Sequence, residues 1–166
     1  ISDKINVSYR EQMRDSSIKN MLDSALNAAN VEVFDMAESK QELKGMGTTV
    51  VCAIVKDGQA YIAHAGDSRA YILKNGEISQ ITTDHSMVQD LLDRGKITSE
   101  QALNHPNKNI ITRAVGVDEN IEIDFDQIDL DDDTTLLLCT DGLSNYVSNE
   151  EILELTSDGK HYAFAD

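Results

Sequence analysis

Apolar residues recur at helical spacing in the first quarter of the chain. From Ile18 they fall every three or four positions until the segment ends near Lys44, and this spacing predicts one long amphipathic helix with a single buried face. The methionines in the stripe are expected to pack in the core rather than to bind a cofactor. The apolar positions are Met21, Leu22, Ala25, Leu26, Ala29, Val33, Met36 and Ala37.

The pattern changes to that of short β-strands after Gly47. Apolar runs predict four strands at residues 48–55, 60–65, 70–73 and 77–81. Asp57-Gly58 and Asn75-Gly76 separate successive pairs, and both dipeptides favour type I′ hairpin turns. We therefore expect an antiparallel meander, whose first strands are apolar almost throughout and so covered on both faces.

Polar and helix-capping residues interrupt the strands between Asp84 and Gly116. Residues 86–89 (SMVQ) and 98–101 (TSEQ) each have the form of a capping box, which begins a helix. The Arg-Gly-Lys sequence at 94–96 ends the first of these helices in a turn. We expect residues 84–116 to form a small helical insertion outside the sheet.

Two more strands and a helix are predicted after the insertion. Residues 121–128 alternate apolar with acidic side chains, which favours a strand with one buried face, and the apolar residues 134–139 predict a fully buried strand. A last helix begins with a capping box at 148–151. This order predicts an α+β fold with helices packed on antiparallel sheets, in one domain over residues 1–166.

The charge balance narrows the possible partners. Thirty Asp and Glu against 14 Lys and Arg give a net charge of −16, so the surface lacks the basic patch that nucleic acids and anionic membranes require. No stretch approaches the length needed to span a bilayer. We expect most carboxylates to be solvated, but a few could converge on divalent cations.

The two cysteines and the first residue bear on the setting of the protein. Cys52 and Cys139 lie in separate apolar runs, which is typical of buried free thiols rather than of a disulfide or a metal site. Free thiols favour a reducing, cytoplasmic compartment. The chain begins with Ile1, and we expect the natural start to lie upstream.

Two aspartates follow apolar strands directly. Asp141 comes after the run 136–139, where a carboxylate is costly to desolvate unless a cation or several donors meet it, and Gly142 would permit a sharp turn. Asp67 has the same context in Gly66-Asp67-Ser68-Arg69. Either could be a simple turn residue, with Asp67 paired to Arg69. Alternatively, the two could come from separate sheets, meet at one edge and share a hard cation.

Other residue types capable of chemistry lack a recognisable pattern. His64, His85, His105 and His161 show no metal-ligand spacing, and we expect His64 and His85 to be structural. Ser68 and Ser144 lack a nucleophile elbow, and no glycine-rich phosphate loop is present.

Seven segments in series resemble one enzyme family. They are residues 47–49 (GTT), 63–71 (AHAGDSRAY), 82–86 (TTDHS), 94–98 (RGKIT), 105–106 (HP), 111–116 (ITRAVG) and 138–143 (LCTDGL). A single GDSR or TDG is a weak signal, but the order and spacing match over residues 45–155. The chain thus resembles the metal-dependent serine/threonine protein phosphatases of type 2C in their compact bacterial form.

The resemblance implies a fold and an activity. The fold would be a two-sheet antiparallel β-sandwich flanked by helices, with the metals at one end and residues 84–116 as a flap that affects substrate access. The activity would be hydrolysis of phosphoserine and phosphothreonine with Mg²⁺ or Mn²⁺, two to three ions in the complete site, by a metal-activated water. Phosphoproteins would be the substrates, and a cognate serine/threonine kinase would oppose the enzyme in bacterial signalling.

The resemblance also implies roles for single residues. Asp141 resembles the aspartate shared between the two-metal centre and a third metal, and Asp67 resembles the other protein ligand of that third metal. Ser68 and Arg69 would support Asp67, and Thr140 and Gly142 would support Asp141.

Several family elements have no counterpart within these residues. The early Asp-Gly-x-Gly-Gly segment, an upstream acidic ligand, a phosphate-binding arginine and a histidine general acid would precede Ile1, and a late Asp-Asn pair would follow Asp166. We therefore expect a fold incomplete at both ends and inactive alone, with open strand edges that strand exchange or a non-native dimer could cover.

Three hypotheses remain open at this point. The chain is part of an active phosphatase, or a non-catalytic phosphatase-like binding module that has lost the metal centre, or an acidic α+β domain without metal. The presence of both Asp67 and Asp141 favours the first over the second, because a binding-only scaffold does not need them.

Overall fold

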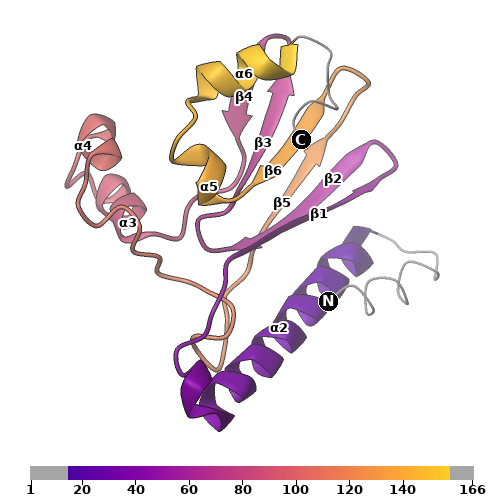
Figure 1. Ribbon diagram of the computed structural model, residues 1–166. Coiled ribbons are helices and arrows are strands. Elements are labelled where there is room, and N and C mark those ends of the chain that lie inside the picture. The colour runs from indigo at the N-terminus through magenta and orange to yellow at the C-terminus, as the bar shows by residue number, and fades with distance from the viewer. Residues whose placement is uncertain (1–14, 158–166) are drawn as a thin grey trace.

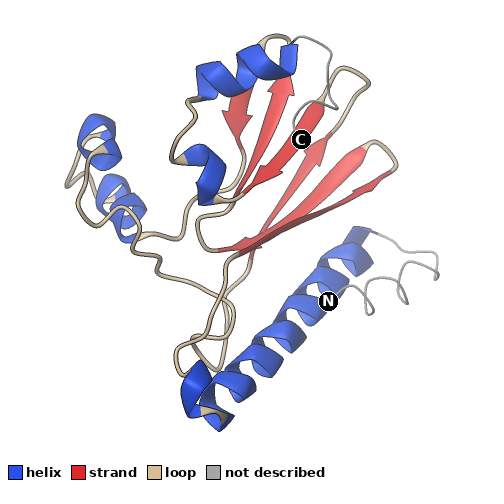
Figure 2. Ribbon diagram, viewed as in Figure 1, coloured by secondary structure: helices blue, strands red, loops and turns tan. Residues whose placement is uncertain are grey.

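Two three-stranded antiparallel sheets and the helices around them make up the computed structural model, which describes residues 15–157 (Figure 1, Figure 2). The strand orders are β1-β2-β5 and β4-β3-β6. The helices are α2 (Asp15–Ser39), the 3₁₀ turn η1 (Gln41–Leu43), α3 (Met87–Asp93), α4 (Ser99–Leu103), α5 (Asp141–Ser144) and α6 (Asn149–Ser157). The strands are β1 (Val50–Lys56), β2 (Gln59–Ala65), β3 (Arg69–Lys74), β4 (Glu77–Gln80), β5 (Asp124–Asp129) and β6 (Thr135–Cys139).

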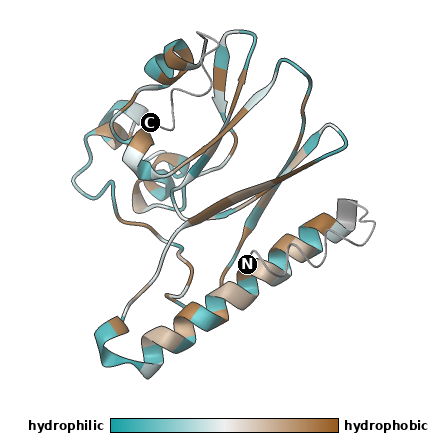
Figure 3. Ribbon diagram, turned by 45° about the vertical axis from the view of Figure 1, so that its right-hand side comes forward, coloured by the Kyte–Doolittle hydropathy of each residue, from teal (hydrophilic) through white to brown (hydrophobic). Residues whose placement is uncertain are grey.

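Helix α2 covers the outer face of the β1-β2-β5 sheet. Its apolar stripe is buried as predicted in the first half of the helix, where Ile18, Leu22 and Leu26 pack against the sheet with 1% or less of their surface exposed. The prediction was wrong for Met36, which is 45% exposed. Figure 3 shows hydrophobic residues along β1 and β2, and alternating character along α2. No helix within residues 15–157 combines the length and apolar character needed to cross a membrane.

The other layers complete a sandwich. Side chains of both sheets, among them Ile62 of β2 and Ala70 of β3, form the core between them. On the far face of the second sheet, Ile152 of α6 packs against Tyr71 and Leu73. The layers therefore run helix, sheet, sheet, helix, which confirms the predicted two-sheet antiparallel sandwich. The prediction that the first strands are covered on both faces is correct for β2 but wrong for β1, most of which is only half-buried.

Both predicted hairpins are present. Asp57 and Gly58 have φ of 52° and 74°, and Asn75 and Gly76 have φ of 54° and 75°. Positive φ at both central residues is what a type I′ turn requires. The first hairpin joins β1 to β2 and the second joins β3 to β4.

The prediction of one continuous meander was wrong. Strands β2 and β3 are not paired; the chain leaves the first sheet after Ala65 and enters the second at Arg69. A second correction concerns β6, expected to be fully buried. It lies at an edge of its sheet, paired with β3 alone among the described strands, so its apolar residues are only partly covered and Leu138 is 38% exposed. The strand exchange or non-native dimer that could cover open strand edges stays a prediction.

Residues 84–116, which we call the α3–α4 segment, leave the sandwich and return to it side by side. The paired residues 85–87 and 110–112 form the neck of the segment. There the Met87 amide donates to the Ile110 carbonyl at 2.9 Å, and the Thr112 amide donates to the His85 carbonyl at 2.8 Å. Figure 1 shows the two helices projecting to the side of the sheets. The segment is therefore anchored at its base.

The predicted caps of this segment are only partly correct. Thr98 and Gln101 form the full reciprocal box, but Ser86 forms half of one, because the Gln89 side chain bonds Asp93 instead. The last helix does begin with the expected box, in which Ser148 and Glu151 exchange bonds.

The cysteines are free thiols, as expected, and each is partly buried. Burial is the main cause that raises the pKa of both the Cys52 and the Cys139 thiol. Neither is therefore poised as a nucleophile.

Asn30 ties helix α2 to the end of the α3–α4 segment. It is 1% exposed, accepts from the Gly116 amide at 2.7 Å, and donates to the Asp118 and Glu119 carbonyls at 2.9 and 3.1 Å. A Cβ on Gly116 would lie 2.1 Å from a Val33 methyl carbon. Helix and segment thus approach as closely as glycine allows.

Replacing Asn30 with alanine should lower the free energy of unfolding by about 2 kcal/mol, since a buried amide loses its partner. Urea denaturation of the chain measures this. Asn27→Ala is the matched control, because it removes only a bond to the Asp23 carbonyl one turn earlier, and it should cost less than about 0.5 kcal/mol. Equal losses in the two variants would contradict the assigned role of Asn30.

Candidate cation-binding site

Asp67 lies in the turn by which the chain crosses between the two sheets. Gly66 has φ of 111°, and a Cβ there would lie 2.3 Å from Thr49 Cγ2, so only glycine fits. The Ser68 hydroxyl, 3% exposed, bonds the Thr49 hydroxyl at 2.8 Å. These contacts fix the turn, and Asp67 extends from it half-buried at the end of the sandwich.

Strand pairing brings Asp141 to the same place. In the antiparallel pair of β3 and β6, Arg69 stands opposite Cys139. Asp67 precedes Arg69 by two residues, and Asp141 follows Cys139 by two residues. Because the strands are antiparallel, both aspartates lie beyond the same end of this pair. Asp67 and Asp141 thus lie at the same end of one sheet, and not on separate sheets as expected. A cation shared between them stays a prediction.

Asp141 does not lie in the sharp turn expected from Gly142. Thr140 is the N-cap of the short helix α5, and Asp141 is its first residue. Gly142 is within this helix and does not have a positive φ. Within the described part of the chain, the Thr140 side chain makes no capping bond to α5. The exposed Asp141 carboxylate accepts a hydrogen bond from Asn145 Nδ2 at 3.3 Å.

Negative charge is crowded around Asp67. Burial, followed by the charge of Asp141 and more weakly that of Asp84, raises the pKa of the Asp67 carboxyl. A raised pKa means that the ionised form is disfavoured where it stands. Carboxylate oxygens are the ligands that Mg²⁺ and similar hard cations prefer, so this pair fits a divalent cation in both donor type and charge.

Arg69 pairs with Asp84 rather than with Asp67. Its Nε and Nη2 donate to the two Asp84 oxygens at 2.8 and 2.6 Å, and its Nη1 donates to the Tyr71 hydroxyl at 3.0 Å. Burial alone would lower the pKa of Arg69, but the bonds to Asp84 outweigh it and raise that pKa. Asp67 lies in a tight bend, as one alternative expected, but the expected pairing of Asp67 with Arg69 was wrong.

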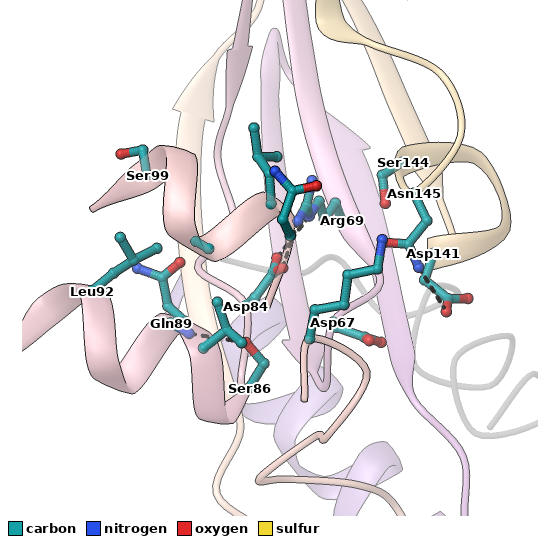
Figure 4. A pocket seen from close by; sticks show the side chains of 15 residues that line it. Asp67, Arg69, Asp84, Ser86, Gln89, Leu92, Ser99, Asp141, Ser144 and Asn145 are labelled. Carbon is teal, nitrogen blue, oxygen red and sulfur yellow. Dashed lines mark hydrogen bonds and ion pairs between the residues drawn. The ribbon is translucent and has the colours of Figure 1, made fainter. Parts of the chain in front are cut away.

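The two aspartates open onto a pocket of about 570 Å³ between the end of the sandwich and the α3–α4 segment (Figure 4). Asp67, Asp84 and Asp141 supply its acidic side. Val88, Leu92 and Leu103 of the segment supply an apolar wall. Ala102 and further polar residues complete the lining: Arg69, Ser86, Gln89, Ser99, Asn104, Lys108, Ser144 and Asn145.

A second cluster lies beside this site and was missed in the sequence. The rings of His64 and His85 stack with centroids 4.6 Å apart and planes 12° apart, and His85 Nε2 lies 3.2 Å from an Asp124 oxygen. One ligand atom from each of the three residues falls within 4.8 Å of the others. Sequence spacing could not reveal the cluster, because its members come from β2, the neck and β5.

The details of this cluster favour a hydrogen-bond network over a cation site. Metal-binding lone pairs lie in the imidazole plane, so two stacked, nearly parallel rings do not direct them at one point. Arg113 Nη1 also donates to Asp124 at 2.8 Å and lies 3.1 Å from His85 Nε2, which puts a positive charge there already. Burial is the largest cause that lowers the pKa of His85, so the ring is neutral at pH 7.

Comparison with known sequences points in one direction. The sequence model of the Protein phosphatase 2C family matches residues 2–91. The chain is 45% identical over 138 residues to the serine/threonine phosphatase stp of Listeria innocua, which covers 83% of this chain and 55% of that protein. The chain thus spans about half the length of the curated relatives it matches.

Solved structures agree with the sequence comparison. The fold is similar to that of the serine/threonine phosphatase Stp1 from Staphylococcus aureus, with a TM-score of 0.85 and 38% identity over 93% of this chain and 61% of that one. It is also similar to the catalytic domain of the protein phosphatase PstP in complex with two manganese ions, with a TM-score of 0.77 and 33% identity over 94% and 66%. This chain belongs to the Protein phosphatase 2C family.

Proposed function

We propose that this chain is the central part of a phosphatase that hydrolyses phosphoserine and phosphothreonine in proteins with Mg²⁺ or Mn²⁺. The observation that carries the proposal is the pair Asp67 and Asp141, set at one end of the sandwich by the pairing of β3 with β6. Family membership and a relative in complex with two manganese ions support it.

Asp67 and Asp141 are the proposed cation ligands. Divalent cations bound at such a site activate water and offset the charge of the phosphoryl group. Ser68 supports Asp67 by tying the turn to Thr49. Arg69 acts indirectly, because it keeps Asp84 paired and so limits the negative charge beside Asp67.

The α3–α4 segment corresponds to the family's flap in this proposal, and the pocket receives the phosphorylated peptide. Lys108 of the segment and Asn145 of the α5 region line the pocket as possible donors to phosphate oxygens. The apolar wall formed by Val88, Leu92 and Leu103 would contact the peptide around the phosphorylated residue. A cognate kinase and a cytoplasmic location belong to the same proposal.

The rest of the metal centre lies, we propose, in sequence outside residues 1–166. The chain spans 55% of a relative's length, and two carboxylates alone make a weak cation site. We therefore expect residues 1–166 to bind Mn²⁺ weakly and not to turn over substrate.

Extending the chain to the length of its relatives should produce hydrolysis of a phosphothreonine peptide with added Mn²⁺, whereas residues 1–166 should be inactive. In the extended protein, Asp141→Asn should lower kcat/KM by about a hundredfold or more, because it removes charge that holds the cation. Phosphate release measures the rates. Asp132→Asn, in the exposed turn at the other end of β6, is the control and should leave them unchanged.

Two results would contradict this account. Robust activity of residues 1–166, abolished by Asp141→Asn, would overturn the view that the centre is incomplete here. No activity in the extended protein would favour the non-catalytic binding module.

Removing the charge of Asp67 should stabilise the cation-free fold. The folded-state pKa of Asp67 is raised by burial and by Asp141, so its ionisation opposes folding above that pKa, and wild-type stability from this group increases as the pH falls through it. In EDTA at pH 7, Asp67→Asn should therefore raise Tm by a few degrees, with a smaller gain in acid. Scanning calorimetry beside Asp132→Asn checks this, and a lower Tm would refute it.

A further inference from the structure

His85 holds both backbone polar groups of Gly66, the residue before Asp67. Its ring Nδ1 accepts from the Gly66 amide at 3.1 Å, and its own amide donates to the Gly66 carbonyl at 3.0 Å. Since Gly66 carries the positive φ of the crossing turn, the direction in which Asp67 leaves the turn depends on these bonds.

The contacts of the His85 imidazole fix the orientation of its ring. Because Nδ1 accepts, the proton of the neutral ring is on Nε2, which faces Asp124 Oδ2 at 3.2 Å. Arg113 in turn bonds both Asp124, at 2.8 Å, and Glu122, at 3.1 Å. The stacked ring of His64, 1% exposed, blocks rotation on one face.

The same residue belongs to the neck of the α3–α4 segment. The His85 carbonyl accepts from the Thr112 amide, and the preceding Asp84 is paired with Arg69 of β3. The base of the segment and the turn that carries Asp67 are thus joined in one hydrogen-bonded unit.

We propose that His85 is a positioning residue, which through its Nδ1 holds the Gly66 turn so that the Asp67 carboxylate faces Asp141, and which couples that carboxylate to the base of the α3–α4 segment. This inference rests on the proposed role of Asp67 and Asp141 as cation ligands. Groups that orient metal ligands in this way commonly alter metal affinity about tenfold or more when removed.

Two substitutions separate positioning from mere packing. In His85→Asn the side-chain oxygen occupies the place of Nδ1 and can still accept from Gly66, but it cannot reach Asp124. In His85→Gln the terminal group occupies the place of Nε2 and can still reach Asp124, but it does not bond Gly66. Both variants lose the stack on His64, so their structural cost is matched, and thermal melting of each verifies this.

The first measurement is amide hydrogen exchange at Gly66 by NMR in residues 1–166. Exchange in His85→Asn should stay close to that of the wild type, and in His85→Gln it should be about tenfold faster, since one hydrogen bond is lost. Equal exchange in the two variants would overturn the proposed clamp.

The second measurement is Mn²⁺ affinity, obtained from the EPR signal of free Mn²⁺. His85→Gln should bind about tenfold or more weakly than the wild type, and His85→Asn should bind nearly as well as the wild type. If the wild type binds and the two variants bind equally, the positioning role is refuted. If the wild type does not bind and Asp141→Asn changes nothing, the proposed function fails, and the Gly66 exchange rates still decide whether the clamp exists.

Discussion

The pairing of β3 with β6 is the constraint on which the candidate site depends. These strands are far apart in the sequence, and their register sets Arg69 against Cys139. Asp67 enters this pair at the start of one strand and Asp141 leaves it at the end of the other. The pairing of the two strands thus brings the carboxylates together. The turn at Gly66 and the helix α5 then set the direction in which each carboxylate points.

That arrangement places unfavourable electrostatic repulsion between carboxylates at one end of the molecule. Asp67 is half-buried beside Asp141, and the nearby arginine is engaged with Asp84. A fold selected for stability alone has no reason to keep a carboxylate in such a place. The rest of the structure over-determines the geometry, since Thr49, His85 and the neck of the α3–α4 segment all hold the turn. Rigid support around a disfavoured charge is what a cation-binding role requires.

Features encoded locally were predictable from the sequence, and those that depend on distant partners were not. Helix α2, both Asx-Gly hairpins and the Thr98 and Ser148 caps follow from spacing and residue type. The crossing between sheets was missed, because Gly66-Asp67-Ser68 resembles a hairpin turn, and the close approach of Thr49 to Gly66 is known only from the fold.

The same distinction applies to the site. Asp67 and Asp141 could be identified because each follows an apolar strand directly. The contacts of Asp84, Arg113 and Asp124 could not be predicted, because the bonds Arg69–Asp84 and Arg113–Asp124 and the approach of Arg113 to His85 join residues 11 to 28 positions apart. The segments TTDHS and ITRAVG contain two of these residues but do not show what they bond. His64 and His85 were expected to be structural, and their stacking on each other accords with that, but the role of His85 at Gly66 needed the fold.

Paramagnetic broadening by Mn²⁺ in an NMR spectrum of residues 1–166 tests the central claim most directly, because it locates a weakly bound ion without requiring turnover. The account predicts that resonances around Asp67 and Asp141 broaden first, and that Asp141→Asn removes the effect. Broadening centred on His64, His85 and Asp124, or spread evenly over the acidic surface, would contradict it.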